Sequence, residues 1–351
     1  MKNPKKILGS LGRRYGGRPF RIFRNLCYDT IALPPKFKEL YDIRRKKYPA
    51  QSEAGCFYDK YYQEGRSRNP KRGIICMYDG RTVHGGLTDR LRGILTTYRE
   101  AKKRGIPFYI YWNSPFELSD YLEPNRVDWR IDSSEISYLK GDAFPVIIQD
   151  RTLFDNGQLL KQAIHNARAQ THVYSNADNA FDEYADLYDD LFKPTEALRK
   201  HTDYHLAKLG TNYHAFTFRF QELLGDFTDH QKITLTGSDY DIFVTKVLDE
   251  FKKIISRLPS STKILVTSDS RKFLDIVAAT DPRIYIVPGE IKHIDLLKGA
   301  YNDAWMKTFI DQQLLMYARH VTLMLTGKMY NSGFPRFAAK VGRTQYTIHR
   351  F

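Results

Sequence analysis

The stretch GIICMYDGRTVHGGLTDRLRGI, residues 73–94, decides the fold that we predict. It begins with a short apolar run, GIICMY (73–78), and reaches two glycines, Gly85 and Gly86, directly before a helical pattern that opens at Leu87. Glycine lacks a Cβ atom and accepts positive φ, so the backbone can turn tightly there and a ligand can approach its N–H groups. The stretch therefore predicts a strand, a glycine turn and a helix, with the turn as a candidate contact to a ligand.

Outward from this stretch, segments typical of strands alternate with segments typical of helices. Short apolar runs predict strands at 73–78, 107–112, 144–149, 171–175, 214–220, 263–268, 283–287 and 321–325. Helical patterns lie between them, at 87–104, 158–169, 180–192, 238–257, 270–279, 301–319 and 333–341. Strand, helix and strand in this order favour parallel sheets that are covered by helices on both faces.

The length of the chain favours two domains, because 351 residues exceed the size at which one core usually stops growing. We expect a basic, aromatic arm at 1–60 and two Rossmann-like domains, at 61–205 and 206–351. Residues 193–212 contain no predicted strand and are expected to connect these domains. The predicted fold class is α/β, with two Rossmann-type domains whose parallel sheets face a central cleft.

Composition argues against several classes of protein. No run approaches the roughly eighteen apolar residues of a spanning helix, and the N-terminus has no apolar secretory signal. The three cysteines, Cys27, Cys56 and Cys76, are too few and too scattered for a disulfide framework or a zinc site. They fit a reduced compartment, so we expect a cytoplasmic protein.

The net charge of +15 indicates an anionic partner, and basic residues gather at the N-terminus. Residues 1–26 carry basic but no acidic side chains, interleaved with apolar and aromatic ones. Such a segment suits the anionic inner face of a membrane and equally a solvated tail, and both interpretations stay open. Nucleic acid is not expected as a partner, because no RNP, helix-turn-helix or zinc-finger pattern accompanies the charge.

The late strands place polar residues where ligands of open α/β sheets bind, outside the carboxyl ends of the strands. Arg219 lies at the end of HAFTFRF (214–220), and further candidates follow the later strands: Ser268, Asp269, Ser270, His293, Ser332 and Gly333. An arginine, hydroxyls and a helix N-terminus at one edge suit a pyrophosphate. Each residue also has a structural interpretation, since Asp269 and Ser332 fit helix caps and Arg219 an ordinary surface position.

These motifs, in this order, resemble those of the GDP-fucose-dependent fucosyltransferases, the superfamily of bacterial nodulation, α1,6- and protein O-fucosyltransferases. HGGLTDRLRGI resembles the glycine loop of that family, HAFTFRFQ its arginine motif, TSDSRKFLD its third-strand motif and NSGFPRFAA its C-terminal Ser/Phe motif. The resemblance covers approximately residues 73–345. One departure is clear, because the His-x-Arg-Arg of the family is here Thr217-Phe218-Arg219-Phe220.

The resemblance implies a GT-B enzyme that inverts anomeric configuration and needs neither a metal nor another cofactor. It implies GDP-fucose as donor and a glycan or glycoconjugate as acceptor, with the donor in the C-terminal domain and the acceptor on the N-terminal side. By position, Arg219 would hold the pyrophosphate and assist the departure of GDP. Asp269 would contact the nucleotide, and Ser332 and Phe334 would lie near the phosphates and base.

Sugar transfer also needs a general base for the acceptor hydroxyl, and Asp89 beside the glycine turn is the candidate. A carboxylate that opens a helix is alternatively explained by favourable pairing with the helix dipole. The same explanation fits Asp239-Tyr240-Asp241, formally a D-x-D, because it opens the helical pattern at 238–257. We therefore expect no metal site there.

Two other functions remain open at this stage. The enzyme could be a glycosyltransferase that uses another nucleotide sugar. The basic charge alone would also suit a non-enzymatic binder of nucleic acid or acidic polysaccharide, whose affinity would fall steeply with salt.

Overall fold

A computed structural model of the protein describes residues 57, 61–65, 69–82, 84–148, 160–161, 163–166, 168–228, 233–289, 294 and 302–351. The chain divides into two compact units. The N-terminal unit consists of Met1–His84, Gly93–Tyr111 and Arg130–Asn179, and the C-terminal unit of Gly85–Arg92, Trp112–Trp129 and Ala180–Phe351. The first turns of the helix after the glycine pair therefore belong to the C-terminal unit.

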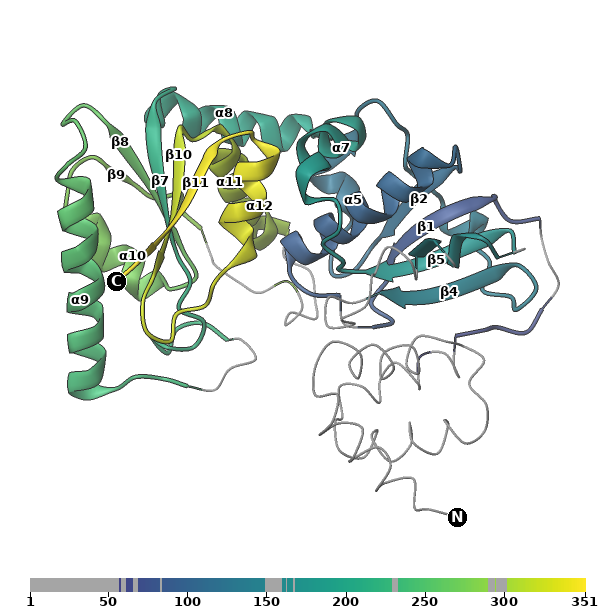
Figure 1. Ribbon diagram of the computed structural model, residues 1–351, viewed down its shortest axis with the longest axis horizontal. Coiled ribbons are helices and arrows are strands. Elements are labelled where there is room, and N and C mark those ends of the chain that lie inside the picture. The colour runs from purple at the N-terminus through teal and green to yellow at the C-terminus, as the bar shows by residue number, and fades with distance from the viewer. Residues whose placement is uncertain are drawn as a thin grey trace, which may run out of the picture. The chain divides into compact units, whose positions relative to one another are not determined.

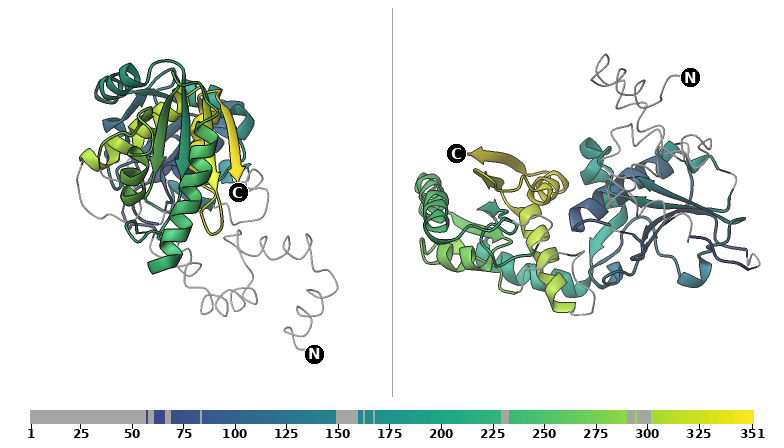
Figure 2. Two further views of the ribbon diagram at one scale, coloured as in Figure 1. Left: turned by 90° about the vertical axis from the view of Figure 1, so that its left-hand side faces the viewer. Right: turned by 90° about the horizontal axis from the view of Figure 1, so that it is seen from below.

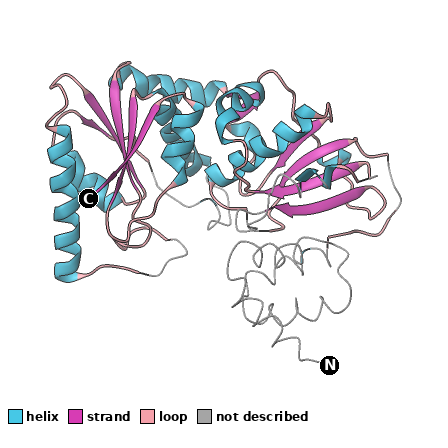
Figure 3. Cartoon of the chain, in the orientation of Figure 1, coloured by secondary structure: helices cyan, strands magenta, loops and turns pink. Residues whose placement is uncertain are grey.

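The N-terminal unit is built on a four-stranded sheet of order β2-β1-β5-β4. Its strands are β1 (Gly73–Tyr78), β2 (Phe108–Trp112), β4 (Ala143–Ile148) and β5 (Gln170–Ser175). Strand β5 pairs in parallel with both β1 and β4, and every residue of β1 and β5 is buried, as in the central strands of parallel sheets. Figure 3 distinguishes the helices, strands and loops of the described residues by colour.

Helix α5 (Leu87–Lys103) connects β1 to β2 and approaches the end of β5 closely. A Cβ atom on Gly93 would lie 2.0 Å from the carbonyl oxygen of Ser175, so only glycine allows this approach. The short helix η2 (Ser133–Glu135) precedes β4 and is closed by a capping box in which Asp132 accepts from the Ser134 N–H.

The C-terminal unit contains a five-stranded parallel sheet of order β11-β10-β7-β8-β9. Its strands are β7 (Tyr213–Phe218), β8 (Lys263–Ser268), β9 (Ile284–Tyr285), β10 (His320–Leu325) and β11 (Gln345–Arg350). The chain runs outward from β7 to β9 and returns on the other side of β7 as β10. This is the doubly wound order, and its switch point lies between β7 and β10.

Helices cover both faces of this second sheet: α8 (Glu196–Leu209), α9 (Gly237–Ile255), α10 (Arg271–Ala278), α11 (Asn302–Tyr317) and α12 (Gly333–Val341). Phe216 and Phe218 of β7 point to the side of α9 and α10 and form one core with Phe251 and Phe273. On the opposite face the Tyr213 hydroxyl donates to the Leu314 carbonyl of α11. Figures 1 and 2 show α9 and α10 on one side of the sheet and α11 and α12 on the other.

A smaller antiparallel pair, β3 (Leu122–Pro124) with β6 (Phe192–Pro194), completes the C-terminal unit. It is accompanied by η1 (Leu118–Asp120), η3 (Phe181–Glu183) and α7 (Tyr184–Leu191). The expectation that 193–212 contains no strand is therefore wrong at its first residues, which belong to β6. The rest of that segment is mainly α8, which begins at a Thr195 cap.

The strands expected from the sequence are all present, with ends that differ by a few residues. Strand β11 was not predicted from the sequence, because four of its six residues are exposed and it therefore has no apolar run. Of the expected helix at 158–169, residues 160, 161, 163 and 164 are helical, whereas its first two residues and most of the arm at 1–60 lie outside the described residues. No helix among the described residues is long and apolar enough to cross a membrane.

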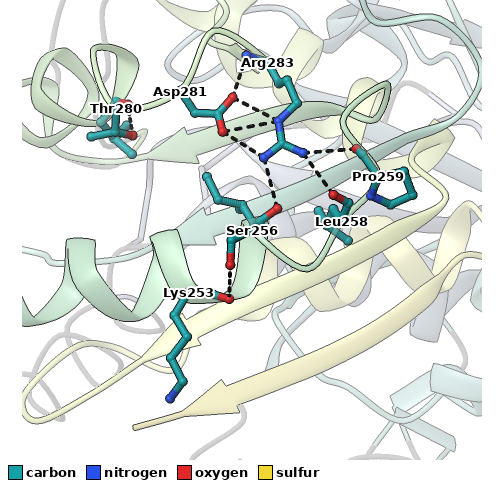
Figure 4. A network of polar contacts seen from close by, with 9 residues as sticks. Lys253, Ser256, Leu258, Pro259, Thr280, Asp281 and Arg283 are labelled. Carbon is teal, nitrogen blue, oxygen red and sulfur yellow. Dashed lines mark hydrogen bonds and ion pairs between the residues drawn. The ribbon is translucent and has the colours of Figure 1, made fainter.

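Arg283, directly before β9, connects this edge of the C-terminal sheet to the end of α9 (Figure 4). Nη2 of Arg283 lies 2.8 Å from Oδ2 of Asp281, and its Nε lies 3.0 Å from Oδ1. The same guanidinium donates to the backbone carbonyls of Ile255, Leu258 and Pro259, which end α9 and begin the loop to β8. Hydrogen bonding to Arg283 lowers the pKa of Asp281, so this carboxylate is ionised at neutral pH.

We predict that Arg283→Lys lowers the free energy of unfolding by about 1–3 kcal/mol, because an ammonium cannot reproduce the planar fork and leaves carbonyls unpaired. Urea unfolding measures the change. The control is Arg271→Lys, since Arg271 pairs with Asp275 at an exposed site and should change stability by less than about 0.5 kcal/mol. Equal unfolding midpoints for the two variants would contradict this account.

Candidate functional site

Three loops meet at the carboxyl edge of the C-terminal sheet, where its topology switches direction. They follow β7, β8 and β10, the central strands of that sheet. The backbone N–H of Tyr330, in the loop after β10, donates to the carbonyl of Arg219 at 3.0 Å. This bond holds the β10 loop against the residue that follows β7, so the sheet brings together the arginine and the Ser332 helix start that the sequence placed at one edge.

Asp269 organises this edge from the end of β8. Its carboxylate accepts hydrogen bonds from the backbone N–H groups of Phe220 at 2.8 Å and Gln221 at 2.6 Å. Nη1 of Arg219 lies 3.0 Å from its Oδ2. Gln221 has a positive φ of 56°, which is uncommon for a residue other than glycine, and the carboxylate holds the backbone in that turn.

The electrostatic setting of Asp269 is that of a buried anion held by its partners. Only 5% of the residue is exposed, and this burial raises the pKa of its carboxyl above the ordinary value, although the charge of Arg219 and the two backbone N–H donors act in the opposite direction. The guanidinium of Arg219 also lies over the Phe227 ring, 4.6 Å from its centroid. Arg219 is thus fixed in orientation by Asp269 and Phe227 at the end of β7.

Ser268 and Ser270 make contacts that support this turn. The Ser268 hydroxyl accepts from the N–H of Ser270 at 3.1 Å. The Ser270 hydroxyl accepts from the N–H of Phe273 at 3.1 Å, as the cap of α10, and donates to Oδ2 of Asp226 at 3.0 Å. These contacts favour a supporting role for both serines, which keeps the β8 loop and the start of α10 in place.

Ser332 caps α12, the helix that follows β10. Its hydroxyl accepts from the N–H of Phe334 at 3.3 Å. Pro335 lies in the first turn, where its missing N–H costs no intrahelical bond. Helix α12 therefore begins where the sequence predicted it, at Ser332 and Gly333, and its first turn is the positive end of the helix dipole.

The glycine turn before α5 has one residue that only glycine can occupy. Gly85 has φ of +80°, and a Cβ atom there would lie 2.6 Å from Oδ2 of Asp89. Gly86 does not have a positive φ, and a Cβ atom on it would lie 4.0 Å from its nearest neighbour, Oδ2 of Asp89. Of the two glycines, Gly85 uses the positive φ that its missing Cβ permits, and Gly86 does not.

Asp89 closes this turn. Its Oδ2 accepts from the Gly86 N–H at 3.1 Å, and its Oδ1 lies 3.0 Å from Nη2 of Arg92. These are the contacts of an acidic residue at a helix start, so they favour the helix-dipole interpretation. A role for Asp89 as general base stays a prediction.

Arg90 is a positioning residue that the sequence analysis did not single out. It is only 2% exposed, its Nε donates to the Gly85 carbonyl at 3.0 Å, and Nη1 donates to the Ser114 carbonyl. The guanidinium lies over Trp112, 4.9 Å from the ring centroid. The available signal was its place on the apolar stripe of α5, beside Leu87 and Leu91, where a charged residue must be paired.

The remaining candidates are not brought into this edge. Asp239 lies in the first turn of α9, as the helix-dipole interpretation predicts. His293 and residues 1–26 lie outside the described residues, so their predicted roles stay predictions. Within the described ranges, no three His, Cys, Asp or Glu side chains gather closely enough to hold a metal ion.

Comparison with known proteins establishes the fold. No protein-family model and no curated protein matches the sequence. The solved structure of NodZ α-1,6-fucosyltransferase co-crystallised with GDP matches with a TM-score of 0.52 and 17% identity, covering 76% of this chain and 92% of that chain. The same enzyme soaked with GDP-fucose matches with a TM-score of 0.51 and 16% identity, covering 77% of this chain and 93% of that chain. The structure of NodZ from Bradyrhizobium matches with a TM-score of 0.50 and 16% identity, covering 76% of this chain and 92% of that chain.

The predicted α/β fold with two parallel sheets is thereby confirmed, because NodZ, a GT-B fucosyltransferase, shares this fold. The resemblance that the short sequence motifs carried is confirmed at the level of the fold.

We predict that Gly85→Ala destabilises the protein by at least about 1–2 kcal/mol, because alanine would adopt a left-handed backbone and its Cβ would overlap Asp89. Gly86→Ala is the matched control and should unfold close to the wild type. Thermal unfolding of both variants measures the difference. If Gly85→Ala melts with the wild type, the turn does not have this conformation.

Proposed function

We propose that the protein is an inverting, metal-independent glycosyltransferase that transfers fucose from GDP-fucose to a glycan or glycoconjugate. The observation that carries the proposal is Arg219, fixed by Asp269 and Phe227 at the switch point of a doubly wound sheet, beside the start of α12. Switch points are where such sheets bind nucleotides. The shared fold with NodZ, whose solved structures contain GDP or GDP-fucose, supports a donor of this class.

The chemistry follows from charge. When the sugar leaves a nucleotide, positive character grows on the anomeric carbon and negative charge on the departing diphosphate. Arg219 and the N–H groups of the first turn of α12 neutralise that charge without a metal ion. Asp269 acts through Arg219 as a positioning residue, because its own oxygens are taken by that arginine and by two backbone N–H groups.

The acceptor hydroxyl attacks from the opposite side and loses its proton to a base. Asp89 stays our candidate, since its side chain is 38% exposed, although Gly86 and Arg92 already contact it. The C-terminal domain would hold the donor and the N-terminal domain the acceptor. We also propose a cytoplasmic location, with the basic arm at 1–26 in contact with an anionic membrane surface.

We predict that GDP and GDP-fucose stabilise the protein and that UDP does not. A nucleotide at about a hundred times its dissociation constant should stabilise the fold by about 2.7 kcal/mol. A thermal-shift series with GDP-, UDP-, ADP- and CMP-sugars measures this, each with and without EDTA. Stabilisation by UDP alone would contradict the assignment of GDP-fucose as donor.

Metal dependence is tested separately by measuring sugar transfer with EDTA. Transfer that stops in EDTA and returns with manganese would contradict the metal-independent mechanism.

We predict that Arg219→Ala lowers kcat by about 10²- to 10³-fold, because it removes a preorganised donor to the leaving group. Arg219→Lys should recover only part of the rate, since an ammonium lacks the planar fork. Arg271→Ala is the control, because that arginine pairs at an exposed position of α10 and should leave kcat unchanged.

Folding must be checked separately, because Arg219→Ala also leaves the Asp269 carboxylate buried without its cation. Arg219→Lys keeps that charge and is the decisive variant if Arg219→Ala unfolds. A folded Arg219→Lys enzyme with wild-type kcat would mean that the donor site lies elsewhere.

A further inference from the structure

A second arginine, Arg81, is fixed in the N-terminal unit in the way that Arg219 is fixed in the C-terminal unit. It lies in the loop after β1, the strand that leads to the glycine turn. Its Nε lies 3.3 Å from Oδ2 of Asp79, a carboxylate whose side chain is only 4% exposed. Its guanidinium lies over the ring of Tyr138, 3.8 Å from the centroid. In each unit, an arginine that follows a central strand is thus held by a buried aspartate and an aromatic ring.

The surroundings of Asp79 keep Arg81 in place. Oδ2 of Asp79 accepts hydrogen bonds from the hydroxyls of Tyr174, at 3.0 Å, and Tyr138, at 3.2 Å. Burial raises the pKa of both tyrosines, so both hydroxyls stay protonated and donate at neutral pH. The backbone N–H of Arg81 also donates to Oδ1 of Asp79 at 3.1 Å. One buried carboxylate therefore fixes Arg81 through its backbone and through its side chain.

Part of the Arg81 side chain remains accessible to a ligand. The side chain is 33% exposed, against 19% for Arg219. Its Nε faces Asp79 and its Nη1 donates to the Tyr61 carbonyl at 3.4 Å, whereas Nη2 has no partner among the residues that the structure describes. A guanidinium that is fixed in orientation and still has donors to offer is preorganised for the two oxygens of a carboxylate, which match its planar fork.

The place of Arg81 in the fold favours an acidic sugar as this ligand. Ligands of open α/β sheets bind outside the carboxyl ends of the strands, and Arg81 follows β1 there, four positions before Gly85. The half-buried rings of Tyr62 and Tyr111 pack on the same core as Tyr138, and rings with an apolar face and a polar tip suit the C–H groups and hydroxyls of a sugar. The net charge of +15 attracts an anionic form of that sugar.

We propose that Arg81 binds a carboxylate of the acceptor, so that the acceptor is an acidic glycan that contains a carboxylated sugar. The inference rests on the proposed function, because it takes the ligand as the acceptor of sugar transfer, and it names the chemical class of that acceptor. Asp79 and Tyr138 act through Arg81 as positioning residues, because the carboxylate is buried and the ring is covered by the guanidinium. Donor and acceptor are then bound by two arginines that are held in the same way, one in each unit.

The test is the binding of glucuronate, galacturonate and N-acetylneuraminate to the full chain, with the methyl ester of each sugar as its neutral counterpart. The wild type should bind at least one acid about tenfold or more tightly than its ester, because the ester lacks the charge that the guanidinium pairs with. In Arg81→Gln the dissociation constant for that acid should rise to about that of the ester, and the affinity for the ester should not change. NMR titration measures these affinities.

Two further variants separate this contact from effects of charge and folding. Lys71→Gln is the matched control, since Lys71 also pairs with a carboxylate, Glu135 at 3.2 Å, and lies over the Tyr109 ring, but it precedes β1. It should leave the affinity for the acid unchanged. Arg81→Lys keeps the charge beside Asp79 and is the deciding variant if Arg81→Gln unfolds. Its ammonium lacks the fork and should raise the dissociation constant about threefold or more. Thermal unfolding shows whether each variant is folded.

The possible failures are distinct. If the wild type binds none of the three acids more tightly than its ester, or if a folded Arg81→Lys binds the acid as the wild type does, this inference is wrong and the proposed function stands. An equal loss of affinity in Lys71→Gln would also overturn it, since the effect would then be one of net charge. If the wild type binds neither GDP nor GDP-fucose, the proposed function is wrong, and an acid that still binds at Arg81 is not the acceptor that this inference names.

Discussion

The buried carboxylate of Asp269 is the interaction on which the candidate site depends. It fixes two backbone N–H groups after β7 and the guanidinium of Arg219, although burial alone would disfavour its charge. A buried carboxylate with these partners is stable only while all of them stay in place, because removal of one leaves an uncompensated charge. The turn at Gln221, with its positive φ, is thus tied to the position of Arg219, the arginine of the proposed mechanism.

The topology of the sheet places this constraint where it can act on a ligand. Parallel strands run outward from β7 and return beside it as β10, and the carboxyl edge at such a switch point is where open α/β sheets bind ligands. The loop after β10 enters that edge, bonds to the Arg219 carbonyl through Tyr330 and then starts α12 at Ser332. One charged side chain and one helix start are thereby held together by backbone contacts, which suits the neutralisation of a leaving diphosphate.

Periodicity in the sequence predicted most of the fold, since buried parallel strands read as apolar runs and the helices between them have clear patterns. It could not find β11, an exposed edge strand, or β3 and β6, which are only three residues long. At the site, the sequence identified Arg219 and the Ser332 cap. The partners of Asp269 could not be predicted, because Phe220 lies 49 positions away and only the fold brings its N–H to the carboxylate. Arg90 is paired by carbonyls that no motif marks.

The central claim is that Arg219 and the start of α12 bind the diphosphate of the donor. A crystal structure of the protein with GDP tests it most directly. Our account predicts that phosphate oxygens lie about 2.7–3.2 Å from the Arg219 guanidinium and from backbone N–H groups in the first turn of α12. GDP bound at another edge of the sheet, with Arg219 in contact only with Asp269 and Phe227, would contradict it.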